Sequence, residues 1–315
     1  MLRVTAPLAT TEVVSSVRHS AVPRIALLAL FWGSSFLWIK LAGRGLSPAE
    51  VTLGRLVLGA GVLFAIVAAR RQPVPRSPAI WGQIVIAALF GNAAPYLLFA
   101  LSEQHVASST AGMLNATTPL WTVLVALAVR HQRSVSLAQA AGLAVGFAGT
   151  VLIFTPWRSA SGFGSVGAIE SLAAAASYGV AYVFMDRYLA RRGLGSVLLA
   201  ACQLLSAAAV LAVIVAVAGA PAPRLDATVT ASIVILGLLG TGAAYVLNYQ
   251  IITSEGATVA STVTYLLPVV AIVLGVVVLG EQVTIPVMAG IALVLAGVAL
   301  TRARPAQTAR PPRPR

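Results

Sequence analysis

The 315-residue chain is too hydrophobic for a soluble protein: 59% of its residues are hydrophobic and 9% are charged, against about 25% charged residues in soluble domains. A formal net charge of +13 would suit a nucleic-acid-binding protein. The basic residues, however, lie mainly between long apolar segments, and this placement favours a membrane protein over a partner of nucleic acid.

Ten apolar segments follow one another, each close to the roughly 20 residues that an α-helix needs to cross about 30 Å of hydrocarbon. The first 24 residues lack the apolar core of a signal peptide, so we expect the first segment to remain as a helix. The connections are short and leave no room for a sizeable soluble domain. The predicted spans are 25–42, 48–69, 80–101, 109–129, 136–154, 166–186, 196–218, 228–251, 258–279 and 284–301.

The basic residues predict the orientation of these spans. With the N-terminus inside, sixteen of the 21 Lys and Arg residues are cytoplasmic, and one, Arg55, lies within a span. The four external ones are Lys40, Arg44, Arg158 and Arg224. Because basic loops are retained on the cytoplasmic side during insertion, we expect both termini to be cytoplasmic and the basic segments to contact anionic membrane lipid.

The sequence also repeats itself at a spacing of 149 residues. Ala94 and Tyr96 match Ala243 and Tyr245 at this spacing, and Pro119 matches Pro268. Two copies of five helices follow, and because five is odd the second copy enters the membrane in the opposite orientation. Such inverted repeats are typical of transporters.

The predicted fold is therefore an all-α integral membrane protein with ten transmembrane helices arranged as two inverted five-helix repeats. We expect a cytoplasmic N-terminal segment, a first repeat, a linker, a second repeat and a basic, disordered cytoplasmic tail. These parts cover residues 1–24, 25–155, 156–165, 166–302 and 303–315.

Several short motifs resemble the drug/metabolite transporter superfamily, specifically its EamA-type ten-helix members. They are WGSSFLWIK at 32–40, SPAEVTLGRL at 47–56, NATTPLW at 115–121 and TYLLPVV at 264–270. The resemblance covers most of residues 25–302 and implies a membrane carrier. One departure is that AVRHQRSVS at 128–136 stands where the family usually has a glycine-glutamate pair like Gly280-Glu281.

Arg55 lies inside the second predicted span, about 10 Å from its external end at 1.5 Å per residue. A charge at this depth costs several kcal/mol unless it pairs, reaches the interface or faces a wet cavity. The family commonly has an arginine at this point. One interpretation is that Arg55 anchors a helix end or contacts lipid headgroups. The other is that it lies beside an external vestibule, together with Lys40, and attracts carboxylates or other anions.

Polar and aromatic residues recur at helical spacing on one face of six spans, which predicts an aromatic-lined, hydrogen-bonding cavity between them. In similar transporters the corresponding helices surround the substrate path. The alternative is that these side chains only join neighbouring helices. The predicted substrate-binding residues are Trp32, Ser35, Arg55, Asn92, Tyr96, Asn115, Thr118, Tyr178, Tyr182, Tyr245, Asn248, Tyr249, Thr264 and Tyr265.

Two further patterns concern helix geometry. Pro95, Pro119 and Pro268 lie within predicted spans, where each frees a backbone carbonyl and permits a kink, so we interpret them as hinges or as plain packing kinks. Gly142 and Gly146, with Gly149 one turn further, form a small-residue seam suited to close helix contact. The seam predicts either an internal contact or a homodimer.

No catalytic or metal-binding motif is present, and no cofactor is expected. The three histidines lie in terminal or loop segments, and no span interior holds two carboxylates. We predict an exporter of small metabolites such as amino acids, working by alternating access in the bacterial inner membrane. The alternatives are drug-type efflux of bulky aromatic compounds and, less favoured, a channel or receptor. The substrate, the direction of transport and the coupling ion stay open.

Overall fold

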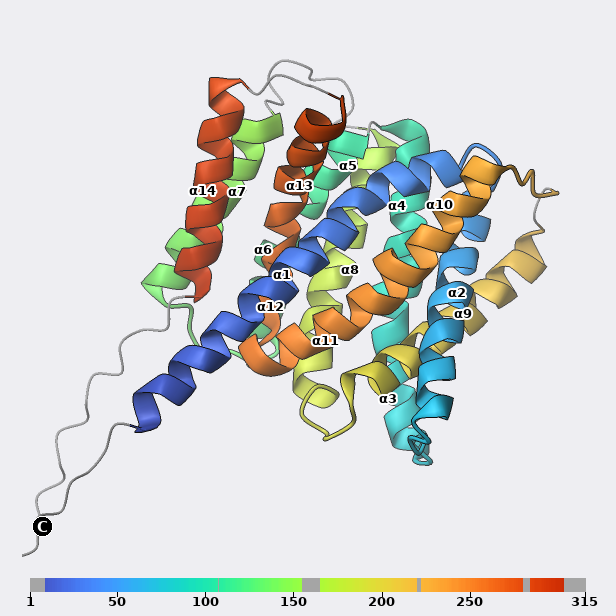
Figure 1. Ribbon diagram of the computed structural model, residues 1–315, viewed down its shortest axis with the longest axis horizontal. Coiled ribbons are helices and arrows are strands. Elements are labelled where there is room, and N and C mark those ends of the chain that lie inside the picture. The colour runs from blue at the N-terminus through green and yellow to red at the C-terminus, as the bar shows by residue number, and fades with distance from the viewer. Residues whose placement is uncertain (1–8, 107, 155–164, 220–221, 280–283, 303–315) are drawn as a thin grey trace, which may run out of the picture.

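The computed structural model describes residues 9–106, 108–154, 165–219, 222–279 and 284–302. Figure 1 shows these residues as a bundle of helices, and they contain no strand. Nearly all of the predicted linker, the basic tail and the Gly280-Glu281 pair lie outside the described residues.

Six of the predicted spans are unbroken helices, whose bounds are α1 Ala9–Ala42, α2 Pro48–Ala69, α7 Leu137–Phe154, α8 Val166–Tyr188, α9 Ser196–Ala218 and α14 Ile285–Arg302. The other four are interrupted. They comprise α3 Pro78–Ala88, η1 Leu89–Ala93 and α4 Ala94–His105; α5 Ser108–Asn115 and α6 Thr118–Ala128; α10 Ala227–Gly237, η3 Leu238–Ala243 and α11 Ala244–Glu255; and α12 Ala257–Ser261 and α13 Val263–Leu279.

The helices have the length and composition of membrane spans. Among the described residues, eight helical stretches are long and apolar enough to cross a bilayer, and Leu137–Ile153 and Ala257–Val270 are shorter apolar helices. The protein is thus a multi-pass membrane protein. The helix that contains the first predicted span, α1, begins at Ala9 and continues through Pro23. Its membrane-length part is Ala21–Ala42.

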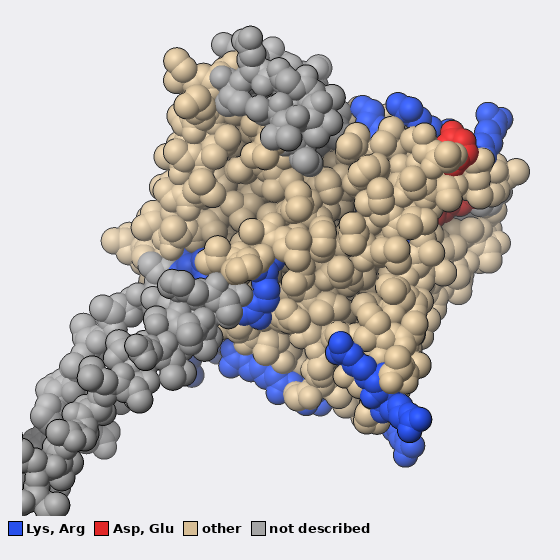
Figure 2. All heavy atoms as spheres, in the orientation of Figure 1, with Lys and Arg blue, Asp and Glu red and all other residues tan. Residues whose placement is uncertain are grey.

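The surface agrees with this assignment. Figure 2 shows a broad uncharged belt with basic side chains along two opposite edges. One group of exposed arginines belongs to the segments that connect helices at one end, at Arg70, Arg71, Arg130 and Arg191. Large apolar side chains such as Val57, in the middle of α2, are exposed, as lipid contact requires.

Local sequence explains where helices at the opposite end begin. A capping box starts α2: Ser47 N donates to Glu50 Oε2 at 2.7 Å, and Pro48 occupies the first turn. Asp226 caps α10 by accepting from Val229 N at 2.7 Å. The loops before these helices are joined, since Arg224 N donates to Gly45 O at 2.8 Å.

The interruptions recur at matching places in the two halves. The segments η1 and η3 are single π-helical turns that begin at Leu89 and Leu238, which is the repeat spacing found in the sequence. π-turns occur frequently at functional sites. Ala94 separates η1 from Pro95, which lies in the first turn of α4. The change of helix geometry is thus in the π-turn, and a hinge role for the proline stays a prediction.

The small-residue seam of Gly142, Gly146 and Gly149 lies in a contact between two helices of this chain. α7 and α14 lie side by side (Figure 1) and make the most extensive helix–helix contact in the described structure. A Cβ atom on Gly149 would lie 2.7 Å from Gly290 O, so only glycine permits this approach. Of the two interpretations of the seam, the structure shows the internal contact. A homodimer stays a prediction.

Candidate substrate-binding cavity

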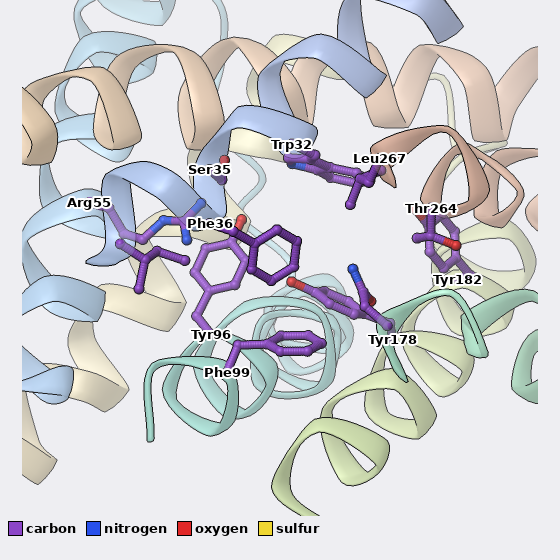
Figure 3. Close-up of a pocket in the computed structure, with 12 residues that line it drawn as sticks. Trp32, Ser35, Phe36, Arg55, Tyr96, Phe99, Tyr178, Tyr182, Thr264 and Leu267 are labelled. Atoms are coloured by element: carbon purple, nitrogen blue, oxygen red, sulfur yellow. The ribbon is translucent and has the colours of Figure 1, made fainter. Parts of the chain in front are cut away.

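A cavity lies between the two halves of the chain, and Figure 3 shows its lining. Helices α1, α2, α4 and α5 contribute from the first half, and α8 and α13 contribute from the second. Its lining residues are Trp32, Ser35, Phe36, Ile39, Arg55, Tyr96, Phe99, Asn115, Tyr178, Tyr182, Thr264 and Leu267. Eight of the fourteen predicted substrate-binding residues are among them: Trp32, Ser35, Arg55, Tyr96, Asn115, Tyr178, Tyr182 and Thr264.

Aromatic rings form much of the cavity wall. Phe99 stacks on Tyr178 with ring centroids 6.1 Å apart, and the edge of Phe36 meets Phe99 at 5.9 Å. Tyr96 is in edge contact with Tyr245 at 6.5 Å. These offset and edge contacts are favourable and fix the rings relative to one another. The cavity therefore has a firm apolar wall suited to an apolar or aromatic group.

Arg55 lies at one end of the cavity, opposite Tyr182 and Thr264 (Figure 3). Its side chain is 4% exposed. Nε donates to Thr241 Oγ1 at 2.8 Å, Nη2 donates to Gly240 O at 3.2 Å, and the guanidinium carbon lies 3.9 Å from the centre of the Tyr96 ring. None of the ion pairs among the described residues includes Arg55. Neutral groups thus solvate this cation, and no carboxylate neutralises it.

The hydrogen-bonding groups of the lining fall into two classes. Ser35 Oγ donates to Phe31 O at 2.8 Å, and Thr264 Oγ1 donates to Ser261 O at 2.9 Å, so both hydroxyl hydrogens are used within their own helices. The buried hydroxyls of Tyr96 and Tyr182 have no hydrogen-bond partner. Because buried polar groups are normally paired, these two phenols are candidates for hydrogen bonds to a ligand, and polar side chains of Asn92, Thr241 and Tyr245 lie near the hydroxyl of Tyr96.

Three predicted residues outside the lining, Asn92, Tyr245 and Tyr249, belong to a hydrogen-bond network around η1. Tyr249 Oη donates to Gln203 Oε1, Gln203 Nε2 donates to Asn92 Oδ1 at 2.6 Å, and Tyr245 Oη donates to the Gly91 carbonyl. Gln203 was missed by the sequence reasoning. Its signal was a single amide within the apolar stretch AACQLLSAAA.

The remaining three predicted residues also lie outside the lining. Thr118 Oγ1 donates to Asn115 Oδ1 at 3.1 Å, and Tyr265 Oη donates to Leu143 O on α7 at 3.2 Å. Asn248 is buried, and its Oδ1 has no hydrogen-bond partner. Direct substrate contact by these residues stays a prediction. Lys40 is exposed and lines a separate groove with Glu103, so it does not share the cavity of Arg55.

The cavity is narrow in this conformation. The volume that the centre of a water molecule can occupy in it is about 40 Å³. One water needs roughly 10–15 Å³ by this measure. A metabolite therefore cannot enter unless the surrounding helices move apart. Among the described residues, no three His, Cys, Asp or Glu side chains are grouped as a metal site would require.

Comparisons with known proteins identify the family. The EamA-like transporter family matches residues 20–155 and again residues 165–303. This chain belongs to the EamA-like transporter family. It is accordingly a membrane transporter of the drug/metabolite type, built from two copies of the family unit.

The relatives include a probable terminal-alkyne amino-acid exporter from Streptantibioticus cattleyicolor, which is 32% identical over 90% of this chain and 94% of its own length. An uncharacterized transporter from Archaeoglobus fulgidus is 28% identical over 87% of this chain and 95% of its own. A crystal structure with 24% sequence identity superposes with a TM-score of 0.72, covering 90% of this chain and 96% of that one. This last similarity shows the fold alone.

Proposed function

We propose that this transporter exports amino acids or closely related amphipathic carboxylates by alternating access. The observation that carries the proposal is Arg55, a buried cation without a carboxylate partner that opens onto an aromatic-lined cavity. A carboxylate in the cavity would supply the missing counter-ion. The relative named as a probable amino-acid exporter supports this substrate class.

The chemistry of the cavity fits a ligand with two unlike ends. The planar guanidinium group binds a carboxylate through paired, charge-assisted hydrogen bonds, which are stronger in a buried site than in water. The rings of Phe36, Phe99 and Tyr178 would contact the apolar side chain of the ligand. The hydroxyls of Tyr96 and Tyr182 would bond its remaining polar atoms.

We place the protein in the bacterial inner membrane with ten crossings, two inverted repeats and both termini in the cytoplasm. The bias of basic residues supports this orientation. The matching π-turns η1 and η3 support an internal duplication, and in inverted repeats the exchange of conformation between the two halves opens a central site to alternate sides. The two predicted spans that are short in the structure would cross as α7 and as α12 with α13.

Efflux of bulky aromatic drugs is the second candidate, and the aromatic wall of the cavity favours it. The two candidates differ in charge preference. Arg55 repels a cationic drug and attracts a carboxylate, and the helix that contributes Trp32 and Ser35 to the lining has no acid in its membrane-length part. Bulky neutral aromatics would remain substrates under the second candidate, and amino acids would not.

The test is transport by purified protein in liposomes preloaded with single unlabelled compounds. We expect external labelled amino acid to accumulate by exchange only when the lumen holds an amino acid, with a rate that saturates. Lumens loaded with a neutral aromatic compound or with a cationic dye serve as the matched controls. Exchange driven by the aromatic compound alone would favour the drug exporter, and a flux that never saturates would indicate a channel.

A further inference from the structure

A second, more polar cavity lies where the segment after α6 meets the ends of α8 and α11, at the end of the bundle that we place in the cytoplasm. The centres of water-sized molecules have about 470 Å³ of room in it, far more than in the central cavity. Charged and polar side chains line it, chiefly His131, Gln132, Asp186, Arg191 and Glu255.

Asp186 is the buried group of this cavity, with 6% of its surface exposed. Its Oδ2 accepts from His131 Nε2 at 3.0 Å and from Ala257 N at 3.4 Å. Its Oδ1 is 3.7 Å from Arg191 Nε, an ion-pair distance, and has no hydrogen-bond partner. A buried carboxylate oxygen without a hydrogen bond is costly, and the cavity beside it can supply a donor.

The other charged groups around this cavity are used elsewhere. Arg187 Nη1 donates to Val129 O at 2.9 Å, and Glu255 pairs with Arg302 at 3.9 Å. Arg191 is largely free to move, because 75% of its side chain is exposed. The cavity thus offers one buried carboxylate oxygen and one mobile guanidinium group, which together match the ammonium and carboxylate groups of a zwitterion.

Asp186 also joins the two halves of the chain, because His131 belongs to the first half and Asp186 and Ala257 belong to the second. Thr258 Oγ1 adds a further contact across the halves by donating to Gln132 Oε1 at 3.3 Å. Tyr178, Tyr182 and Asp186 lie four residues apart on α8 and therefore on one face. This face leads from the central cavity, which Tyr182 lines, to the polar cavity about 6 Å further along the axis.

We propose that the polar cavity is a second substrate site, where Asp186 binds the ammonium group of an amino acid arriving from the cytoplasm and Arg191 binds its carboxylate. By binding Oδ1, the ammonium group partly neutralises the carboxylate and weakens its attraction to His131 on Oδ2, so binding loosens a contact that joins the two halves at this end. The inference rests on the proposed export of amino acids. It adds that the primary amine, besides the carboxylate, is recognised.

The experiment uses inside-out membrane vesicles, in which the end that we place in the cytoplasm faces the bath. Uptake of a labelled amino acid is inhibited with norleucine or with hexanoate, which has the same carbon chain and carboxylate without the amine. We compare wild type, Asp186→Asn and the matched control Glu170→Gln. Glu170 lies near the other end of α8 and is also paired with a histidine, His105, at 3.6 Å.

In Asp186→Asn we expect the half-inhibitory concentration of norleucine to rise about tenfold, since the neutral amide cannot form a charge-assisted hydrogen bond with the ammonium group. That of hexanoate should change less than about twofold, and Glu170→Gln should alter neither by more than this, because Glu170 lines neither cavity. Equal shifts for norleucine and hexanoate, or no shift, would overturn the inference.

Two further observations keep the test decisive. If Asp186→Asn does not reach the membrane, Arg191→Gln replaces it, because this exposed side chain can be changed without disturbing the core. It should raise the half-inhibitory concentrations of norleucine and hexanoate together, through the shared carboxylate, and unchanged values would overturn the inference. Wild-type vesicles that take up no amino acid would instead overturn the proposed function, so the two failures are distinguishable.

Discussion

Arg55 and Asp186 are the two charged side chains that are buried among the described residues, and their surroundings are opposite in kind. Two basic side chains, His131 and Arg191, lie next to Asp186. Arg55 has a threonine hydroxyl, a backbone carbonyl and an aromatic ring, and no acid. Asp186 is thus largely neutralised by the protein itself, whereas Arg55 leaves a positive charge in its cavity.

The comparison teaches what each buried charge can do. Burying an ion costs several kcal/mol unless partners compensate for the lost water. The Arg191 guanidinium and the His131 imidazole compensate Asp186, and the bond to His131 makes it a contact between the halves. Dipoles and a ring compensate Arg55 only in part, so its cavity favours an anionic ligand. The same rule, that a buried charge needs partners, thus separates Asp186, whose partners join the two halves, from Arg55, whose cavity lacks an acid.

The largest effect is expected when the uncompensated charge is removed. Arg55→Met keeps an apolar chain of moderate length but deletes the cation. Transport of carboxylate substrates should fall by at least tenfold, corresponding to about 1.4 kcal/mol of binding. The measurement is the initial rate of exchange in liposomes, normalised to the amount of reconstituted protein.

The matched control is Lys40→Met, which removes an exposed cation from the last turn of α1, outside the cavity lining. It should leave the exchange rate within about twofold of wild type, as expected for a surface substitution. An equal fall in the exchange rate of both variants would mean that the net positive charge of the protein matters. It would contradict a specific role for Arg55.

A smaller effect should follow when one neutral partner of the cation is removed. Thr241→Val keeps the side-chain volume but deletes the oxygen that accepts from Arg55 Nε at 2.8 Å. We expect the KM for a carboxylate substrate to change about threefold, since a single hydrogen bond contributes about 0.5–1.5 kcal/mol. Saturation curves of exchange would measure the change.

Thr150→Val is the control for this substitution, because Thr150 is equally buried and its hydroxyl donates to Gly146 O within its own helix. It lies outside the cavity lining and should leave the KM unchanged. A KM for Thr241→Val that equals that of Thr150→Val would show that Thr241 does not position Arg55.

The sequence predicted much of this arrangement because its signals are local. The bounds of α2, Pro48–Ala69, agree with the predicted span 48–69, since a capping serine and a first-turn proline mark its start. The spacing between Tyr96 and Tyr245 predicted an internal repeat, and the family model matches the chain twice, once in each half. Helical spacing selected seven residues that line the central cavity, because polar residues on one face of a membrane helix face protein or water, and Arg55 was selected as a charge inside a predicted span.

Other features depend on tertiary packing, which one sequence does not reveal. The π-turns η1 (LFGNA) and η3 (LLGTGA) are only five and six residues long, which is too short for a hydrophobic period to reveal them. Tyr245 and Tyr249 lie on the predicted face, yet the Tyr245 hydroxyl donates to the Gly91 carbonyl and the Tyr249 hydroxyl donates to Gln203 of α9. The partners of Asp186 come from segments 55 and 71 residues away, at His131 and Ala257, which spacing cannot foresee.

The central claim is that Arg55 binds the carboxylate of the substrate through its planar, two-pronged guanidinium group. The most direct measurement is the affinity of purified wild type and Arg55→Lys for an amino acid and for its amide, by titration calorimetry in detergent. The amide keeps the amine and side chain but lacks the carboxylate charge. We expect wild type to prefer the acid by about tenfold, the value of one good charge-assisted contact. Lysine, a point charge without the fork, should reduce that preference severalfold while leaving the affinity for the amide nearly unchanged. Equal affinities for acid and amide in wild type and in Arg55→Lys would contradict the claim and leave Arg55 as a structural residue.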